Sequence, residues 1–410
     1  MDHVLFLAHR IPFPPDRGDK IRSHHILKRL AALGPVHVAT FADDDADCAE
    51  EAVLASVARS YRLVRRAKPL LVAGASSLLR GEPVSLPAFH SAELARYVEQ
   101  VLAEHPVGTI YVFSGQMGQY VPDDFAGRVI LDFVDVDSAK FEAYAADGRG
   151  AMRWVHAREG RLLRREEARL AIRADTCLLI SAEEAALFAA RLPATARMVA
   201  DVRVLGNGID SDVFDPVAVA PEPRLAVLAG PRLIFTGQMD YPPNVDAARR
   251  LATRILPLVR RELPEASCHI VGRNPGAEVL ALDGRDGVHV WGRVDDIRTW
   301  LVGATVAAVP LAIARGVQNK VLEAMAMALP VVLTSGAANG IPAQDGRDFA
   351  IADSDEAIAA AIVALHRDPV QAAALGTAAR QFVMTRQAWP AALAPLDAVL
   401  TGAGPTRHAA

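Results

Sequence analysis

Short apolar runs rich in β-branched residues alternate along the chain with longer segments whose apolar residues recur at helical spacing. This alternation is typical of parallel sheets whose two faces are covered by helices. We expect strands at Val4–Ala8, Val36–Phe41, Thr109–Phe113, Val129–Phe133, Thr176–Ile180, Val202–Leu205, Arg232–Thr236, Cys268–Val271, Val288–Trp291, Thr305–Pro310, Pro330–Thr334 and Phe349–Ile351. We expect helices at Asp19–Leu33, Arg153–Ala174, Val245–Glu262, Val317–Ala328 and Asp355–Arg367. The pattern therefore predicts an α/β protein made of two successive units.

The boundary between the units is marked by Gly, Asp and Pro residues that crowd together from Leu205 to Pro231, where regular periodicity stops. We assign residues 1–205 to an N-terminal Rossmann-like lobe and residues 206–384 to a C-terminal one. Each lobe would be doubly wound, and a ligand would bind at the carboxyl ends of its strands, in a central cleft that the lobes face. Residues 403–410 are expected to form a flexible tail.

Composition narrows the class of protein. Of the 410 residues 51% are hydrophobic and 22% are charged, so each unit can bury a core. A net charge of −4 argues against a dedicated nucleic-acid binder. The three cysteines stand far apart without metal-site spacing, which favours a reduced, cytoplasmic compartment. No signal peptide is evident, and the longest apolar stretch, Trp300–Ala314, is shorter than the roughly 18–20 residues that a spanning helix needs.

Two loops could carry chemistry. The first strand is followed by a Pro-rich loop that ends in Gly18 at the mouth of a helix, where free backbone N–H groups could hold an anion. Arg17 and Lys20 would add positive charge, although a glycine needed only for loop geometry fits equally well. In the second unit, Lys320 and Glu323 share one helical face behind Arg315 and Gly316. A cation suited to a diphosphate beside a carboxylate suited to vicinal hydroxyls fits a nucleotide sugar, while a solvated helix face is the plain alternative.

Four blocks of the sequence resemble the retaining glycosyltransferases of the GT-B class known as family 4. They cover most of the chain and include the Gly18 loop, GNGIDSDVFDP from residue 206, FTGQMDYPPN from residue 235, and RGVQNKVLEAMAM from residue 315. The last two spellings are most similar to those of sugar transferases associated with exosortase/PEP-CTERM exopolysaccharide loci. The resemblance implies a GT-B architecture. It also implies that the C-terminal segment, about 385–402, returns to the first lobe.

The resemblance assigns roles to several residues. Glu323 matches the second glutamate of the family's E-x7-E element, which usually holds the donor's ribose, and the first glutamate falls on Arg315, a departure from the pattern. Gly237 and Gln238 are expected to contact the donor, but the family's clamp cations are absent after them, so Arg315 and Lys320 would bind the diphosphate. The remaining expected donor contacts are Gly18 for the diphosphate, the loop at Gly292 and Arg293 for the base, and Gly316 and Asn319 beside Lys320.

The acceptor side is expected near the fourth predicted strand. The family often has a histidine there that faces the reaction centre, and Asp135 takes that position, with Asp132 and Asp137 as alternatives. A carboxylate could orient an acceptor hydroxyl and accept its proton, whereas a turn or capping aspartate is the plain alternative. We expect no metal at the Asp-x-Asp of residues 135–137 or at Asp43–Asp45, and no cofactor beyond the donor substrate.

A basic segment suggests a surface partner. Residues 149–173 hold three glutamates and eight arginines, namely Arg149, Arg153, Arg158, Arg161, Arg164, Arg165, Arg169 and Arg173. Such a helix could lie on anionic lipid at the inner face of the cytoplasmic membrane, or its charges could be paired within the fold. The cluster Arg59, Arg62, Arg65, Arg66 and Lys68 has the same two interpretations.

The favoured function is a retaining glycosyltransferase that moves a sugar from a nucleotide-diphosphate sugar to a hydroxyl of a glycan or lipid-linked saccharide, in exopolysaccharide biosynthesis. One alternative is a catalytically silent nucleotide-sugar-binding or scaffold protein of the same fold. Another is a nucleotide-sugar epimerase, for which the sequence offers no matching set of acid and base groups. The donor base, the sugar, the acceptor and the oligomeric state are not specified by these patterns.

Overall fold

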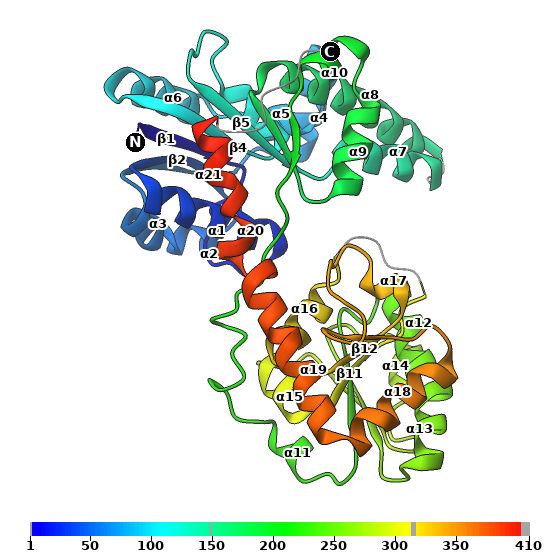
Figure 1. Ribbon diagram of the computed structural model, residues 1–410. Helices are drawn as coiled ribbons and strands as arrows, with labels where there is room; N and C mark the ends of the chain where they lie inside the picture. The colour runs from blue at the N-terminus through cyan, green and yellow to red at the C-terminus, as the bar shows by residue number, and fades with distance from the viewer. Residues whose placement is uncertain (1, 148–149, 313–316, 403–410) are drawn as a thin grey trace. The chain divides into compact units, whose positions relative to one another are not determined.

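The computed structural model describes residues 2–147, 150–312 and 317–402 (Figure 1). The chain forms two compact units. The N-terminal unit comprises Met1–Asn207 and Leu393–Ala410, and the C-terminal unit comprises Gly208–Ala392. Each unit is an α/β layer structure around one parallel sheet, so the expected fold of two Rossmann-like sheets is confirmed. The tail expected at 403–410 lies outside the described residues.

The N-terminal unit has a seven-stranded sheet in the order β3-β2-β1-β4-β5-β6-β7. Its strands are β1 His3–Ala8, β2 Val36–Ala42, β3 Ser60–Arg65, β4 Val107–Phe113, β5 Arg128–Val134, β6 Thr176–Leu179 and β7 Val202–Val204. Its helices are α1 Gly18–Leu33, α2 Asp45–Ala49, α3 Glu51–Val57, α4 Leu70–Arg80, α5 Ser85–Ala88, α6 Ala92–Glu104, the 3₁₀ turn η1 Gly115–Tyr120, α7 Asp137–Asp147, α8 Gly150–Arg173, α9 Ala182–Arg191, α10 Ala194–Val199 and α21 Ala394–Thr401. All pairs of neighbouring strands are parallel.

The C-terminal unit has a six-stranded parallel sheet in the order β10-β9-β8-β11-β12-β13. Its strands are β8 Arg232–Thr236, β9 Ser267–Val271, β10 Val288–Gly292, β11 Val306–Val309, β12 Val331–Leu333 and β13 Ala350–Ile351. Its helices are α11 Pro223–Ala226, α12 Pro242–Arg250, the π turn η2 Leu251–Ile255, α13 Leu256–Glu262, α14 Ala277–Leu280, α15 Ile297–Gly303, α16 Asn319–Ala326, α17 Ser335–Ala338, α18 Asp355–Arg367, α19 Pro369–Phe382, the π turn η3 Val383–Gln387 and α20 Trp389–Ala392.

The central strands are buried on both faces. Every residue of β2 is buried, as are Val4–Ala8 of β1 and all of β9 and β11. Consecutive buried residues in a strand require helices over both faces of the sheet, because successive side chains point to opposite sides. This is why the continuous apolar runs of the sequence mark the strands so well.

The strand β3 was not expected. Its sequence, SYRLVR, carries two arginines and reads as a basic cluster, yet it pairs with β2 in parallel. As an edge strand it exposes one side of its backbone, and charged side chains are common there because they discourage pairing with another chain.

The strand orders place a topological switch point in each sheet. In the N-terminal unit the chain moves from β1 through β2 to β3 at one edge of the sheet, and from β4 through β5 and β6 to β7 at the other. In the C-terminal unit it moves outward in the same way from β8 to β10 and from β11 to β13. Loops diverge at such a point, and ligands of doubly wound proteins bind there, beyond the carboxyl ends of the strands. The two switch points therefore define where functional side chains are to be sought.

Candidate functional site

The switch point of the C-terminal unit brings together the end of β8 and the start of α16. The chain leaves β8 at Gly237 and Gln238, and it leaves β11 toward α16, which begins at Asn319. Both segments thus lie at the carboxyl edge of the sheet, between neighbouring strands. Arg315 and Gly316, two of the residues expected at this site, lie outside the described residues.

Lys320 is held across the end of β8. Its ammonium nitrogen donates to Oδ1 of Asn244 at 2.5 Å and lies 4.7 Å from the centroid of the Phe235 ring. Asn244 is buried, and its Nδ2 donates to the backbone oxygen of Gln238 at 2.9 Å. The side-chain amide therefore fixes the cation relative to the β8 loop without neutralising its charge.

Burial shifts the pKa values of Lys320 and Glu323, and the charge of each residue opposes the shift of the other. Burial lowers the pKa of Lys320 to about 8, and the Glu323 carboxylate partly opposes that shift. Burial raises the pKa of Glu323, and Lys320 opposes that shift. Both groups are poorly hydrated. A ligand would therefore bind favourably if its anion contacted the ammonium and its hydroxyl groups contacted the carboxyl group.

Glycines allow backbones to approach closely at this edge. Gly237 has φ = +150°, and a Cβ built there would lie 2.9 Å from both Asn244 Nδ2 and Lys320 Nζ. A Cβ on Gly272, which follows β9, would lie 1.6 Å from the backbone oxygen of Gly237. The N–H of Gly272 in turn donates to the oxygen of Gly292 at 2.8 Å. The ends of β8 and β9 thus meet through backbone that leaves no room for a Cβ at Gly237 or Gly272, and a backbone hydrogen bond joins β9 to β10.

Sequence reasoning missed a cation at this edge. Arg273 follows Gly272, and its Nη2 donates to Oε1 of Gln238 at 3.0 Å while the side chain stays exposed. Arg273 could have been found from the order of the strands. Because β9 lies beside β8, a residue just after β9 can reach the loop after β8. Arg273, which follows the neighbouring strand β9, therefore places a positive charge beside the loop after β8.

The expected residues of this unit fall into two groups. The structure brings Gly237, Gln238, Lys320 and Glu323 together, and Gly292 stands next along the same edge. Arg293 is exposed at the end of β10, and Asn319 is exposed as the first residue of α16. Gly18 and Asp135 belong to the N-terminal unit.

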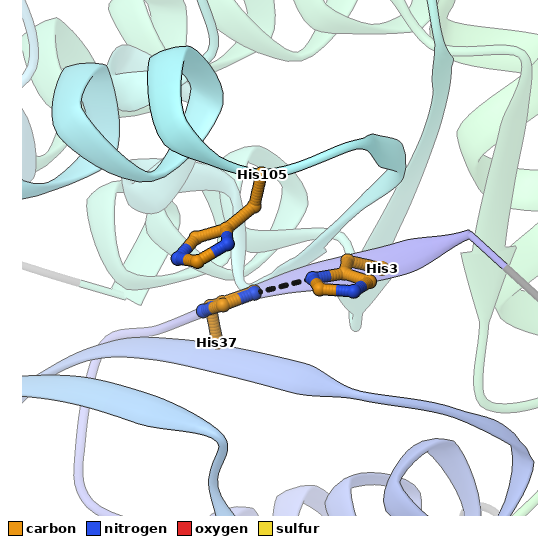
Figure 2. A group of neighbouring side chains, drawn as sticks. All are labelled: His3, His37 and His105. Carbon is orange, nitrogen blue, oxygen red and sulfur yellow. Dashed lines mark hydrogen bonds between the residues drawn. The ribbon is translucent and has the colours of Figure 1, made fainter.

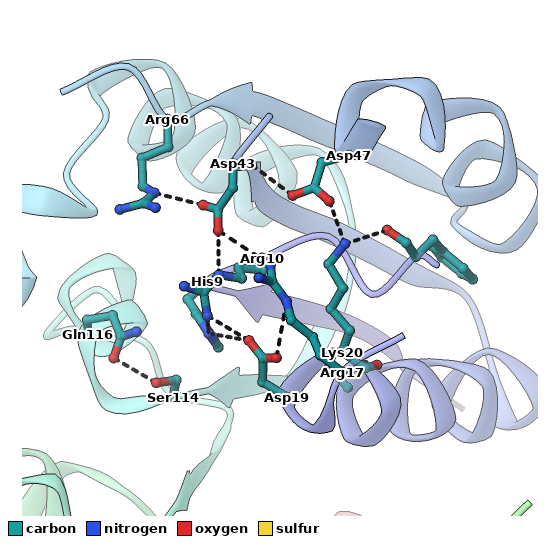
Figure 3. A network of polar contacts seen from close by, with 12 residues as sticks. His9, Arg10, Arg17, Asp19, Lys20, Asp43, Asp47, Arg66, Ser114 and Gln116 are labelled. Atoms are coloured by element: carbon teal, nitrogen blue, oxygen red, sulfur yellow. Dashed lines mark hydrogen bonds and ion pairs between the residues drawn. The ribbon is translucent and has the colours of Figure 1, made fainter. Parts of the chain in front are cut away.

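Gly18 begins α1 at the switch point of the N-terminal unit, and a Cβ there would have no heavy atom within 4 Å. The space beside this helix start is open. The expectation that Lys20 adds positive charge to the loop is wrong, because Lys20 is buried in an ion pair with Asp47 and also donates to the oxygen of Phe13 at 3.1 Å (Figure 3). Arg17 lies 3.4 Å from an oxygen of Asp43.

A polar network that the sequence did not suggest surrounds His9, the first residue after β1 (Figure 3). His9 is buried and stacks on Phe113, and its Nε2 lies 3.3 Å from Oδ2 of Asp19. Arg10 donates to Asp19 at 2.7 Å and to Asp43 at 2.6 Å. Burial alone would raise the pKa of Asp19, but hydrogen bonds from His9 and Arg10 lower it well below its ordinary value. The network holds a histidine beside an ionised carboxylate at the switch point.

The three candidate aspartates after β5 have different surroundings. Asp132 is fully buried; Arg22 donates to it at 3.0 and 3.2 Å and Tyr111 at 2.9 Å. Asp135 is exposed in the loop that leads to α7. Burial raises the pKa of Asp137, as do the charges of Asp135 and Glu184, and the charges of Lys140 and His9 oppose this shift only in part. Asp132 is thus engaged inside the fold, and Asp135 is the carboxylate accessible to a ligand.

Comparison with known proteins finds a family model that matches part of the chain. Residues 230–368, all within the C-terminal unit, match the family model described as Glycosyl transferases group 1. No curated protein matches the chain in sequence.

Solved structures resemble the chain over nearly its whole length. Anabaena Alr3699/HepE in complex with UDP is 14% identical, with a TM-score of 0.63 over 98% of this chain and 100% of that one. The sucrose-phosphate synthase of Thermosynechococcus elongatus is 16% identical, with a TM-score of 0.59 and the same coverages. WaaG, a glycosyltransferase involved in lipopolysaccharide biosynthesis, is 17% identical, with a TM-score of 0.57 over 97% of this chain and 100% of that one.

Proposed function

We propose that this chain, a glycosyltransferase of the GT-B fold, transfers a sugar from a nucleotide-diphosphate sugar to a hydroxyl of a glycan or lipid-linked saccharide, with retention of anomeric configuration. The observation that carries the proposal is the Lys320–Glu323 pair on α16, held against the glycine-lined end of β8. Its chemistry suits a diphosphate and a ribose a few ångströms apart. The UDP in the Anabaena protein of the same fold supports this choice of donor.

In the donor site Lys320 binds the diphosphate, together with backbone N–H groups at the start of α16. Glu323 accepts hydrogen bonds from the ribose hydroxyls. The base lies against the backbone at Gly292 and beside Arg293, and Arg273 adds positive charge near Gln238. Arg315, Gly316, Asn319 and, from the N-terminal unit, Gly18 are assigned to the donor by the family resemblance. Leaving-group charge is stabilised by these cations and N–H groups, without a metal ion.

In the acceptor site Asp135 orients the attacking hydroxyl and accepts its proton. Its exposure at the carboxyl edge of the N-terminal sheet supports this role. The acceptor is proposed to be a saccharide of exopolysaccharide assembly carried on a lipid.

A lipid-linked acceptor calls for a membrane-facing surface, and we propose that α4 and α8 form it. Leu71 and Leu79 of α4 are 88% and 90% exposed, and Trp154 of α8 is 62% exposed. The two helices are joined where Arg158 Nη2 donates to the oxygen of Ser77 at 2.8 Å. Among the described residues no helix is long and apolar enough to cross a membrane.

Some arginines of α8 are paired within the fold and others are exposed, so each of the two interpretations applies to part of the helix. Arg158 and Arg173 donate to backbone oxygens inside the unit, and Arg169 pairs with Glu166 at 2.7 Å. Arg153, Arg161 and Arg165 are exposed. Exposed apolar side chains beside exposed arginines suit the headgroup region of an anionic bilayer, on whose inner leaflet we place the protein.

A donor screen tests the function. Wild type, Lys320→Ala and Glu323→Ala would be mixed with UDP-, GDP-, ADP- and TDP-sugars, and thermal stabilisation and nucleoside-diphosphate release would be measured. Lys28→Ala and Glu356→Ala, both at exposed positions, are matched controls. We expect one donor to stabilise wild type and both controls and to release diphosphate, with both effects lost in the two site variants and unchanged by EDTA. Binding without release in the presence of acceptors would instead indicate a silent binding protein.

The stereochemistry and the membrane surface need separate experiments. NMR of the first product formed should show the anomeric configuration of the donor, and inversion would contradict the retaining mechanism. Flotation with phosphatidylcholine vesicles should require added phosphatidylglycerol and should fall in Leu71→Ser/Leu79→Ser. Val370→Ser, at an apolar position on α19 that is 80% exposed, is the control. Equal flotation of all variants would rule out the α4 surface.

A further inference from the structure

Three histidines meet at the amino-terminal edge of the N-terminal sheet (Figure 2). His3 is the first residue of β1, His37 is the second residue of β2, and His105 ends α6 just before β4. The network of Figure 3 follows the other end of β1, a strand of six residues, so roughly 20 Å separates the two groups at 3.3 Å per residue. The cluster is therefore separate from the donor and acceptor chemistry.

The nitrogens of the three rings converge. Nδ1 of His3 lies 2.9 Å from Nε2 of His37, and one ring nitrogen of each residue lies within 4.8 Å of the others. The rings of His37 and His105 are stacked, with centroids 4.4 Å apart. Tetrahedral binding at 2.0–2.1 Å places ligand nitrogens about 3.3 Å apart, so small rotations of the half-buried His3 and His105 suffice.

His37 is oriented by a chain of hydroxyl groups. Its Nδ1 lies 2.7 Å from Oγ of Ser60, which lies 2.6 Å from the Tyr97 hydroxyl. In the tautomer whose Nδ1 donates to Ser60, Nε2 keeps its lone pair on the side that faces His3. Metal-binding histidines are fixed in this way, because their second ring nitrogen bonds to a neighbouring polar group.

The set of donor atoms indicates the kind of metal ion. Three imidazole nitrogens without a carboxylate or thiolate suit Zn²⁺ and its transition-metal neighbours better than Mg²⁺ or Ca²⁺.

We propose that His3, His37 and His105 bind one divalent transition metal ion of the zinc type, with water at the fourth position. The ion would join β1, β2 and the α6–β4 connection, which are far apart in sequence. Because metal is bound by the folded chain alone, it would stabilise the N-terminal unit. This site does not depend on the proposed sugar transfer.

The test uses the full chain, freed of any purification tag and of metal, and titrates it with Zn²⁺ against a chromophoric chelator. We expect one equivalent to bind tightly to wild type and to raise the melting temperature. His105→Ala, at a half-buried position, should lose this binding by at least a hundredfold, and Ser60→Ala should weaken it about 10- to 100-fold. His366→Ala, an exposed histidine on α18, is the matched control.

A spectroscopic measurement distinguishes this site from other histidines. Co²⁺ bound by three imidazoles and water should give intense visible absorption bands in wild type and His366→Ala, and none in His105→Ala. His3→Ala serves as a second variant if His105→Ala is unstable. If Zn²⁺ binds wild type, His3→Ala and His105→Ala equally, or binds none of them, the proposal is wrong and the three histidines only pack against one another.

Discussion

The ammonium nitrogen of Lys320 donates to Oδ1 of Asn244 at 2.5 Å, and this amide is itself tied to the backbone of Gln238 at 2.9 Å. A neutral partner orients the cation and leaves its charge available. Because Lys320 is the only lysine between residues 208 and 392, its titration can be followed by itself in the C-terminal unit.

The first prediction concerns pH. Burial lowers the pKa of Lys320 from 10.5 to about 8, and a diphosphate binds the protonated form. Donor affinity should therefore be constant below about pH 7 and fall up to tenfold per pH unit above pH 8. Lys320→Arg should flatten this profile, and NMR of ¹³C-methylated amines should show a resonance that titrates near pH 8 and is absent in Lys320→Arg. An unchanged affinity up to pH 9.5 would contradict the role of Lys320.

The same shift affects stability in the opposite direction. Between pH 8 and 10.5 the unfolded chain binds more protons at this position than the folded chain does, so the Lys320 contribution to the free energy of unfolding rises with pH. Comparing urea unfolding of wild type and Lys320→Arg at pH 7 and 10 isolates this contribution. General alkaline unfolding would lower both the stability and the donor affinity. A free energy of unfolding that rises with pH while the donor affinity falls therefore has another cause.

The second prediction concerns Gly237. A methyl group there would clash with Asn244 and Lys320 at 2.9 Å, and a φ of +150° is unfavourable for any residue with a Cβ. Gly237→Ala should lower stability by about 1–3 kcal/mol and weaken donor binding more than tenfold, because Lys320 must move. Gly74→Ala is the control, since a Cβ there would also have open space around it and Gly74 is assigned to neither the donor nor the acceptor site. Chemical denaturation and donor titration measure both effects.

The third prediction separates Asp132 from Asp135. Breaking the buried pair with Arg22 by Asp132→Ala should destabilise the protein by about 3–5 kcal/mol, because a buried guanidinium loses its partner. Urea unfolding measures this loss. If stability stays unchanged while turnover is lost, Asp132 is the reactive carboxylate and our assignment is wrong.

The fourth prediction concerns Asp135 itself. Asp135→Asn keeps the shape of an exposed side chain but removes the proton acceptor, so kcat should fall about 10²- to 10⁴-fold. Donor affinity and thermal stability should not change. Asp124→Asn, an exposed aspartate in the preceding loop, is the control for changes of surface charge. Turnover that survives in Asp135→Asn would direct attention to Asp137 and His9.

Sequence pattern predicted the strands that are buried on both faces, because a continuous apolar run leaves little alternative. It missed β3, whose arginines at the sheet edge have no such run. It predicted that Lys320 and Glu323 lie together on one helix, since spacing along a helix is visible in sequence, and both residues do lie on α16. It missed Arg273 and His9 because their places follow from which strands are neighbours. It also misjudged Lys20, whose partner Asp47 is 27 residues away.

The last prediction concerns Glu323 and the ribose. If this carboxylate accepts hydrogen bonds from the ribose hydroxyls, wild type should bind the preferred nucleoside diphosphate more tightly than its 2′,3′-dideoxy analogue. Hydrogen bonds to a charged group contribute about 1.5–3 kcal/mol, so the ratio of dissociation constants should be roughly 10 to 150. In Glu323→Ala both ligands should bind equally weakly. Glu323→Gln should keep part of the ratio because its amide oxygen still accepts a hydrogen bond. A ratio near one in wild type, with Lys320 still required for binding, would leave the diphosphate assignment intact and remove Glu323 from the ribose.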